Sequence, residues 1–354
     1  MKIQATTFLP LLVGGVLFAS AKTTSGVLAG PSSQYAAGLA ALDHIRFVQE
    51  AGNQERLPTL RIEANLQIVN GTGLSETGAN GAGNLILGYA EGDSALLRSG
   101  SHNVILGTGH SWSGTTSLLM GRDHTVTSIG SAAVGGIGAL VEGPGAVVLG
   151  GSGGEATSDG SVVVGGRNNR ATGPYAMTVG GEGLLASGYA ASAKGGKSNV
   201  VSGSHAVAVG GLSNVSSGSE SSVFGGYNLT VSGNNAFAGG GRSRDRSGTN
   251  SSAIGGEGGL NTGPTGLNSA VVGGVYNHAP GSECSAVGGI SNQAANNNTA
   301  TSGGAYNLAS GSSSSVCGGE WNEAAATYST VSGGSDEVAD NSSAWVAGSK
   351  DEDN

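Results

Sequence analysis

The residue types best suited to chemistry gather between residues 100 and 125. His102, His110 and His124 lie there with Ser111 and Asp123, the kinds of side chain from which a hydrolytic triad is built. No nucleophile motif surrounds Ser111, and none of the six histidines lies three or four residues from another, a spacing typical of zinc ligands. We therefore expect no catalytic residue, no metal site and no cofactor, and we predict that the chain is not an enzyme.

A second group that could do chemistry is a cluster of charge formed by Arg242, Arg244, Asp245 and Arg246. A solvated bulge of the backbone explains this cluster without any ligand. The alternative is a contact with an anionic sugar or a neighbouring chain. Arg242, Arg244 and Arg246 are therefore the candidate surface contacts.

The composition narrows the class of protein that could carry such residues. Glycine makes up 68 of the 354 residues, while charged residues make up 11%, about half the usual share. Glycine does not recur every third residue, which excludes collagen, and an apolar pattern between the glycines argues against disorder. The net charge of −9, with 15 Lys and Arg, leaves no basic face for a nucleic acid.

Glycine recurs every 15 residues from Gly135 to Gly348, with a single step of 18. A short fixed period sustained over such a length indicates a solenoid, and the longer step indicates an insertion in a loop of one coil. In all but the last repeat the next residue is also Gly, which predicts a Gly-Gly turn. Taken as position 0 of each repeat, the expected structural turn residues are Gly135, Gly150, Gly165, Gly180, Gly195, Gly210, Gly225, Gly240, Gly255, Gly273, Gly288, Gly303, Gly318, Gly333 and Gly348.

Counted from this glycine, positions −4 and −2 hold small side chains and share one strand face, so we expect them to form a narrow interior. Position −3 varies from Ser222 to Trp345, as an outward position should. Position +6 is mostly Ala or Val. Position +8 is Gly in ten repeats and Asn at 296 and 341, which predicts a second tight turn with a positive φ angle. Each repeat then reads as strand, Gly-Gly turn, short strand and Gly turn, which is one coil of a flattened, all-β parallel roll.

Position +4 is Asn in seven repeats. Amides stacked in this way can hydrogen-bond to one another and to the turn backbone along a solenoid, which is our interpretation. A ligand-binding row is the alternative. The column comprises Asn169, Asn199, Asn214, Asn277, Asn292, Asn307 and Asn322.

The cysteines, Cys284 and Cys317, are too few for a disulfide framework. They lie two repeats and three residues apart, so at one strand spacing per coil their Cα atoms are roughly 9 to 10 Å apart or more. That is too far for a bridge within one chain, and we expect free thiols.

The N-terminal third is less regular. Residues 1–21 have Lys2 before an apolar run and end in Ala-Ser-Ala, which predicts a secretory signal peptide; a membrane anchor is the alternative, but the run is short and interrupted. Residues 22–70 are expected to hold a linker, a short helix and a capping strand. The helix is predicted over 35–50, as a cap or a trimer neck, and the strand is predicted over 60–68, covering the first coil. Residues 80–130 form irregular early coils, whose larger residues Leu85, Leu87, Ile105 and Leu119 predict a wider core, residues 131–349 form the regular roll, and residues 350–354 form an acidic tail.

Segments such as SSVFGGYNLTVSG, SAVGGISNQAANN and SSVCGGEWNEAAA resemble the head-domain repeats of trimeric autotransporter adhesins, over roughly residues 80–349. The resemblance implies a left-handed parallel β-roll, a homotrimer and a role in surface attachment. Those adhesins continue into a coiled-coil stalk and a membrane β-barrel anchor, whereas residues 349–354 show neither pattern. We therefore expect an anchorless, secreted or cell-surface relative, with no membrane span after signal cleavage.

The leading hypothesis is an adhesin-like structural and binding protein that attaches through the outer face of the roll. Its ligand would be a component of the extracellular matrix or a surface glycan. One alternative is an ice- or crystal-binding solenoid, although the outward columns are not the Thr columns that such solenoids use. Another is a polysaccharide-active β-helix enzyme, although few charged side chains are available to gather in a cleft.

Overall fold

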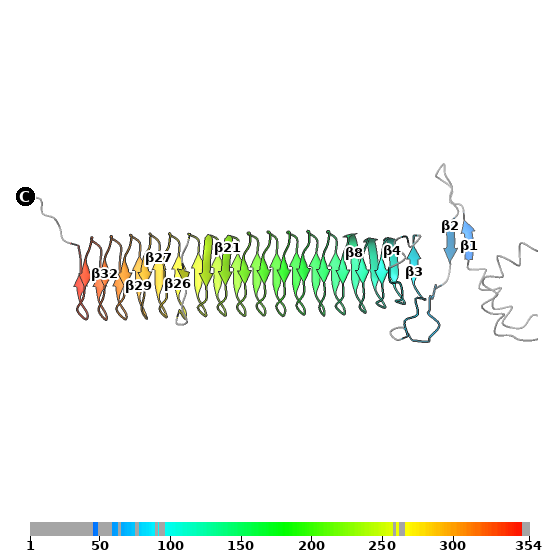
Figure 1. The fold of residues 1–354 in the computed structure, drawn as a ribbon, viewed down its shortest axis with the longest axis horizontal. Coiled ribbons are helices and arrows are strands. Elements are labelled where there is room, and N and C mark those ends of the chain that lie inside the picture. The colour runs from blue at the N-terminus through cyan, green and yellow to red at the C-terminus, as the bar shows by residue number, and fades with distance from the viewer. Residues whose placement is uncertain are drawn as a thin grey trace, which may run out of the picture. The chain divides into compact units, whose positions relative to one another are not determined.

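A computed structural model of the chain describes residues 45–48, 59–62, 65–74, 78–88, 91, 96–257, 260–261 and 266–348. All regular elements among these residues are β-strands, as the sequence predicts (Figure 1). The chain divides into two units, residues 1–67 and residues 68–354. The predicted signal peptide and the acidic tail lie outside the described residues.

The first unit contains two short strands, β1 (Ile45–Val48) and β2 (Thr59–Ile62), which pair in antiparallel fashion. The prediction of a helix over 35–50 is therefore wrong for residues 45–48, and the rest of that segment lies outside the described residues. Three of the four residues of β1 are β-branched or aromatic and favour a strand. The helical spacing covered only about two heptads, too few to stabilise a helix without a partner.

The strand predicted over 60–68 is confirmed only in part. It begins at Thr59 and ends at Ile62, while residues 65–68 form no strand and Leu66 is exposed. All four of its residues pair with the four described residues of β1. That it covers the first coil stays a prediction.

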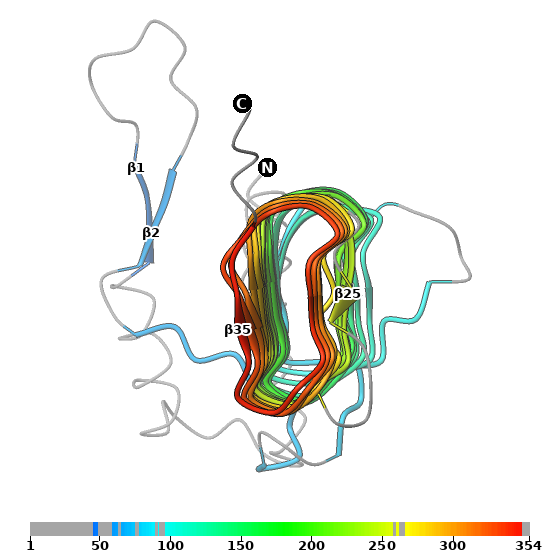
Figure 2. The same ribbon diagram turned by 90° about the vertical axis from the view of Figure 1, so that its left-hand side faces the viewer.

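The second unit is a parallel β-solenoid, viewed along its length in Figure 2. Its main sheet has 18 described strands, each paired with the next coil in parallel, with β3 and β35 at opposite ends. Across the 18-residue step Ser252 still pairs with Ala270, so the three extra residues leave the sheet in register. The strands are β3 (Leu85–Leu87), β4 (Val104–Thr108), β6 (Leu118–Arg122), β8 (Ala132–Ile137), β10 (Val147–Leu149), β12 (Val162–Val164), β14 (Met177–Val179), β16 (Ser192–Lys194), β18 (Val207–Val209), β20 (Ser222–Phe224), β22 (Phe237–Gly239), β24 (Ser252–Ile254), β26 (Ala270–Val272), β27 (Ser285–Val287), β29 (Ala300–Ser302), β31 (Ser315–Val316), β33 (Thr330–Val331) and β35 (Trp345–Val346).

The opposite wall is built from the short strands at positions +5 and +6. These strands form two separate sheets, one after the other along the solenoid. The first sheet is β5 (Ser111–Trp112), β7 (Thr125–Val126), β9 (Leu140–Val141), β11 (Glu155–Ala156), β13 (Arg170–Ala171), β15 (Leu185–Ala186), β17 (Val200–Val201), β19 (Val215–Ser216), β21 (Tyr227–Val231), β23 (Arg242–Arg246) and β25 (Leu260–Asn261). The second is β28 (Gln293–Ala294), β30 (Leu308–Ala309), β32 (Glu323–Ala324) and β34 (Val338–Ala339). A third ladder, of single bridges at position +2, runs from Ile137 to Ser335, and the sequence did not predict it.

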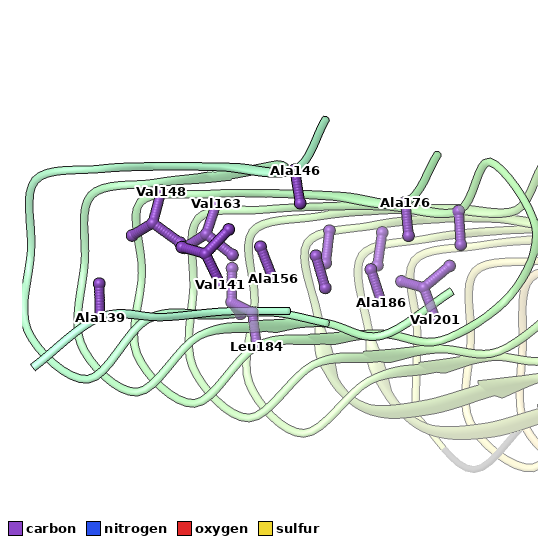
Figure 3. Close-up of a cluster of buried hydrophobic side chains, with 14 of the residues drawn as sticks. Ala139, Val141, Ala146, Val148, Ala156, Val163, Ala176, Leu184, Ala186 and Val201 are labelled. Carbon is purple, nitrogen blue, oxygen red and sulfur yellow. The ribbon is translucent and has the colours of Figure 1, made fainter. Parts of the chain in front are cut away.

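The core lies between the two walls and is narrow, as predicted. Val148 and Val163 at position −2 are fully buried and point into the same interior as Ala156 and Ala186 at position +6 (Figure 3). Opposite walls can approach closely because the side chains at these two positions are small.

In the early coils, Ile105 and Leu119 are buried, but Leu85 and Leu87 are exposed. Leu85 and Leu87 lie at positions −3 and −1, which point outward. Of the four residues on which the prediction of a wider core rested, Ile105 and Leu119 therefore lie in the core, and Leu85 and Leu87 do not.

The glycines of the repeat are required for two physical reasons, a positive φ angle and the close approach of the next coil, which combine differently at three positions. At position 0, from Gly135 to Gly333, all have positive φ, and a side chain would mostly meet open space. Gly348, the last of the series, lacks the positive φ. At position +1, glycines such as Gly196 have positive φ and also lie against the backbone of the next coil. A glycine therefore serves conformation at position 0, and both conformation and space at position +1.

The prediction of positive φ at position +8 is wrong. Gly188 and its equivalents have ordinary φ angles, but a Cβ atom there would collide with the carbonyl of the next coil, at Gly203. Close approach of stacked backbones, rather than a left-handed turn, therefore requires Gly. Asn296, which replaces it, also lacks positive φ, and its side chain reaches the next coil to donate to Ser310 O at 3.1 Å. The left-handed residue lies two positions later, as at Ala190 and His205.

The two causes can be separated by substitution. Gly188→Ala should lower the free energy of unfolding by about 1 to 3 kcal/mol, because the methyl group overpacks the coil interface. Gly195→Asn should cost less than about 1 kcal/mol, because Asn tolerates positive φ and the position faces open space. Urea denaturation followed by circular dichroism measures both. Equal stability of Gly188→Ala and the unaltered protein would contradict the close-approach explanation.

Candidate functional site

The Asn column at position +4 lies inside the solenoid. All seven asparagines are at most 1% exposed. In Asn199 the side-chain Nδ2 donates to Gly210 O in the next coil at 2.9 Å and to Gly195 O in its own coil at 3.3 Å. Its Oδ1 accepts from the backbone N–H of Asn214 at 2.9 Å. Each amide thus fastens a Gly-Gly turn to the coil that follows.

The hydrogen-bond partners of these amides are backbone groups, so the column is not the amide-to-amide ladder that the sequence suggested. The Oδ1 atoms of Asn277, Asn292 and Asn307 each accept one hydrogen bond from the backbone N–H of the next member, at 3.0 to 3.1 Å. Buried turn carbonyls need such donors, because an unpaired buried polar group costs about 1 to 3 kcal/mol. With the amides buried and engaged, the geometry supports a structural role rather than a ligand-binding row.

Two buried histidines occupy this column in the early coils. His124 Nδ1 accepts from the backbone N–H of Ala139 at 3.1 Å, and its Nε2 lies 3.0 Å from Met120 O. His110 makes the matching contacts, accepting from the N–H of His124 at 3.2 Å and lying 3.1 Å from Leu106 O. An imidazole therefore supplies the same acceptor and donor as an Asn amide. Nδ1 accepts a hydrogen bond, so both rings are neutral and carry their proton on Nε2, as assigned from the hydrogen bonds.

The environment of the two histidines opposes their protonation. The rings stack with centroids 5.1 Å apart, and both are at most 2% exposed. Burial lowers the pKa of His110, with Asp123 acting in the opposite direction and Arg98 adding to the lowering. Burial also lowers the pKa of His124, and the neighbouring His110 adds to this, again against Asp123. A neutral stacked pair serves structure. Neither His110 nor His124 has a ring nitrogen left for the triad considered with Ser111 and Asp123, since backbone groups engage both nitrogens of each ring.

Of the three candidate surface contacts, Arg242 is the one whose side chain the structure describes. Arg242 lies on the third ladder, where its guanidinium stands 5.2 Å from the Tyr227 ring centroid and 3.9 Å from Glu257 Oε1. Arg244 and Arg246 pair in the backbone register with Leu229 and Val231, residues that are themselves fully buried. Their side chains lie outside the described residues. Only Arg242 is therefore placed on the surface, with partners within the chain.

Neighbouring coils of the third ladder pair opposite charges in the same way. Arg167, Glu182 and Lys197 follow one another at 15-residue intervals, and Glu182 forms ion pairs with both neighbours. Exposed pairs of this kind contribute little each. Their arrangement shows that one side chain per coil becomes a continuous surface column.

A surface that sequence reasoning missed is the outer face of the main sheet. We define it by the large apolar residues at position −1, and most are one-third to one-half exposed. Valine and methionine at position −3 add to it. A count of position −1 would have found the face, because its residues are Met120, Val134, Leu149, Val164, Val179, Val209, Phe224, Ile254, Val272 and Val287, interrupted by Lys194 and Gly239.

Both cysteines are free, as expected. Burial raises the pKa of the Cys284 thiol to about 11, which makes it a poor nucleophile. Among the residues that the structure describes, no three His, Cys, Asp or Glu side chains are grouped as a metal site, and no helix is suited to crossing a membrane.

The Asn column can be tested at Asn199. Asn199→Ala should lower the free energy of unfolding by about 2 to 3 kcal/mol, because the Asn214 N–H and the turn carbonyls lose their partner and a cavity opens. Asn199→Leu should cost less, because Leu184 in the preceding coil and Leu229 two coils further on fill the same position. Urea denaturation ranks the variants, and a loss from Leu as large as that from Ala would contradict this account.

The histidine pair makes stability depend on pH. Because the pKa of each ring is lower in the folded than in the unfolded chain, the unfolded state takes up protons first as the pH falls below about 6.5. Stability is then full above that pH and declines below it, by at most about 1.4 kcal/mol per histidine per pH unit. Urea denaturation at pH 7.5 and 5.5 measures the decline. The His110→Asn/His124→Asn variant should lose less stability over this range, and an equal decline in both proteins would refute the assignment.

The chain matches no protein-family model and no curated protein.

Proposed function

We propose that this chain is an exported, adhesin-like structural and binding protein, working outside the cell or at its surface as a homotrimer. The observation that carries the proposal is the outer face of the main sheet. From Met120 to Val287 it crosses 12 strands, so at one strand spacing per coil it is about 50 Å long. Soluble monomers rarely expose a continuous apolar strip of this size, and such strips mark sites of association.

The form of the strip favours other copies of the same chain as its partner. It is straight, two residues wide and nearly uncharged, with Lys194 as its charged interruption. Copies placed side by side with their axes parallel would bury the strip along its whole length, matching apolar residue to apolar residue. The resemblance of the repeats to trimeric autotransporter adhesin heads supports three as the number of copies.

Attachment would then use the surfaces that assembly leaves open. The turns and the third ladder lie on other sides of each coil, and their side chains differ from coil to coil. A rigid array of such columns, present three times, binds multivalently even where each contact is weak. This supports attachment to an extracellular matrix component or a surface glycan as the activity.

Light scattering on the purified protein tests the assembly. The expected mass is three protomers, and Phe224→Glu/Ile254→Glu should shift it to one, because charge on the apolar strip opposes association. Beads coated with the unaltered protein should also bind surfaces carrying matrix or glycan more strongly than beads coated with this variant.

Leu212→Glu is the matched control, since Leu212 is an exposed apolar residue on the third ladder instead of the main sheet. It should remain a trimer. A monomeric unaltered protein, or equal dissociation of both variants, would reject the proposed assembly.

A further inference from the structure

Exposed aromatic side chains recur at position +3 in the C-terminal coils. Tyr276, Tyr306 and Trp321 occupy this position, with Ser291 between the first two, and we call these three aromatic residues the aromatic row. They are 64%, 44% and 55% exposed, so they add nothing to the core. The row adjoins the third ladder and not the outer face of the main sheet, and it would stay open in the proposed trimer.

The backbone at these positions is one that bulky residues rarely adopt. Tyr276, Tyr306 and Trp321 have φ angles of 55°, 55° and 58°. Earlier coils place Gly, Ser or Asn at the same position, as at Gly183, Ser198 and Asn168. A bulky side chain in this left-handed region is strained, and at position +3 three coils carry that strain without burying the ring.

The strained conformation is held by the stack of coils. The N–H groups of Tyr306 and Trp321 donate to Ile290 O and Ala305 O in the preceding coil at 2.9 and 3.0 Å. The Tyr306 and Trp321 rings stack with centroids 4.3 Å apart and planes 7° apart. Since the two residues stand at the same position of consecutive coils, the stacked planes lie across the solenoid axis. One face of Tyr306 is then turned toward the coil of Ser291, and one face of Trp321 toward the coil of Asp336.

The spacing of the row leaves room for one ligand ring between Tyr276 and Tyr306. Tyr276 precedes Tyr306 by two coils, which at one strand spacing per coil is about 9 to 10 Å. The small side chain of Ser291 stands in the coil between them. A saturated sugar ring over Ser291 would lie within stacking distance of Tyr306, and the negative face of an aromatic ring attracts the C–H groups of such a ring.

The charge around the row selects among ligands. The sequence contains no Lys or Arg from residue 247 to residue 349, so an anionic ligand would find no cation beside the row. Glu320 adjoins Trp321 directly, and Asp336 takes position +3 in the next coil, with both carboxylates exposed. Carboxylates accept hydrogen bonds from hydroxyl groups and repel sulfate, phosphate and sialic acid.

We propose that the aromatic row is a binding site for an uncharged glycan, whose sugar rings stack on Tyr306 and Trp321 while Glu320 and Asp336 accept from its hydroxyl groups. The site rests on the proposed function, because it supplies the ligand class for attachment. It differs from the anionic-sugar contact considered at the arginine cluster in both place and charge.

Isothermal titration with cellohexaose, chitohexaose and mannohexaose tests the site in the full chain. At least one should bind, and Trp321→Ser should weaken that binding about tenfold or more, as loss of a central aromatic contact typically does. Tyr306→Ser/Trp321→Ser should abolish it. Serine is chosen because the fold already carries it at this position in Ser291, Ser198 and Ser213.

Tyr328→Ser is the matched control, since Tyr328 is an exposed aromatic with a φ angle of 60° at position −5, outside the row. It should leave binding unchanged, and circular dichroism should show all variants folded. Absence of binding to all three oligosaccharides, unchanged binding by the double variant, or stronger binding to heparin hexasaccharide or polylysine would overturn the proposal. Trimer formation in light scattering is a separate readout, so the glycan site can fail while the proposed assembly stands.

Discussion

The stacking of each coil's backbone on the next, one strand spacing away and in constant register, is the constraint on which the rest of this structure depends. It brings the chain so close to its own next turn that a Cβ atom at Gly188 would collide with a carbonyl. It also leaves carbonyls of the Gly-Gly turns, such as Gly210 O, in need of a donor within the stack. The Asn column supplies these donors, since each amide hydrogen-bonds a turn to the coil that follows.

Because of the same constraint, a residue type that recurs in the sequence forms a continuous feature of the molecular surface. Any side chain that recurs at one position becomes a straight column with one member per coil. Opposite charges then pair along the axis, as in Arg167 and Glu182, and aromatic rings stack, as in Tyr306 and Trp321. Binding by such a molecule depends on columns and faces rather than on an enclosed cavity, and this is the physical basis for both proposals.

Sequence reasoning succeeded where a single residue type has a single cause. Small residues at −4, −2 and +6 admit no reading except a narrow interior, and they are buried. It failed where one residue type has two causes. Glycine at +8 was assigned to a positive φ angle, but it is required by close approach, and no sequence pattern separates these explanations. The helical spacing at Ile45 and Val48 was similarly ambiguous, because over so few residues a tertiary pairing decides the conformation.

By itself, the sequence determined the period, the interior columns and the position of the insertion, because these follow from residue size and backbone freedom within one repeat. Only the tertiary structure decided which groups meet between repeats. His110 and His124 became buried equivalents of asparagine because the coils align them with Ala139 and the column beyond. The residues at −1 became one apolar face, and three strained aromatics one row, because the constant register of the stack adds separate residues into continuous surfaces.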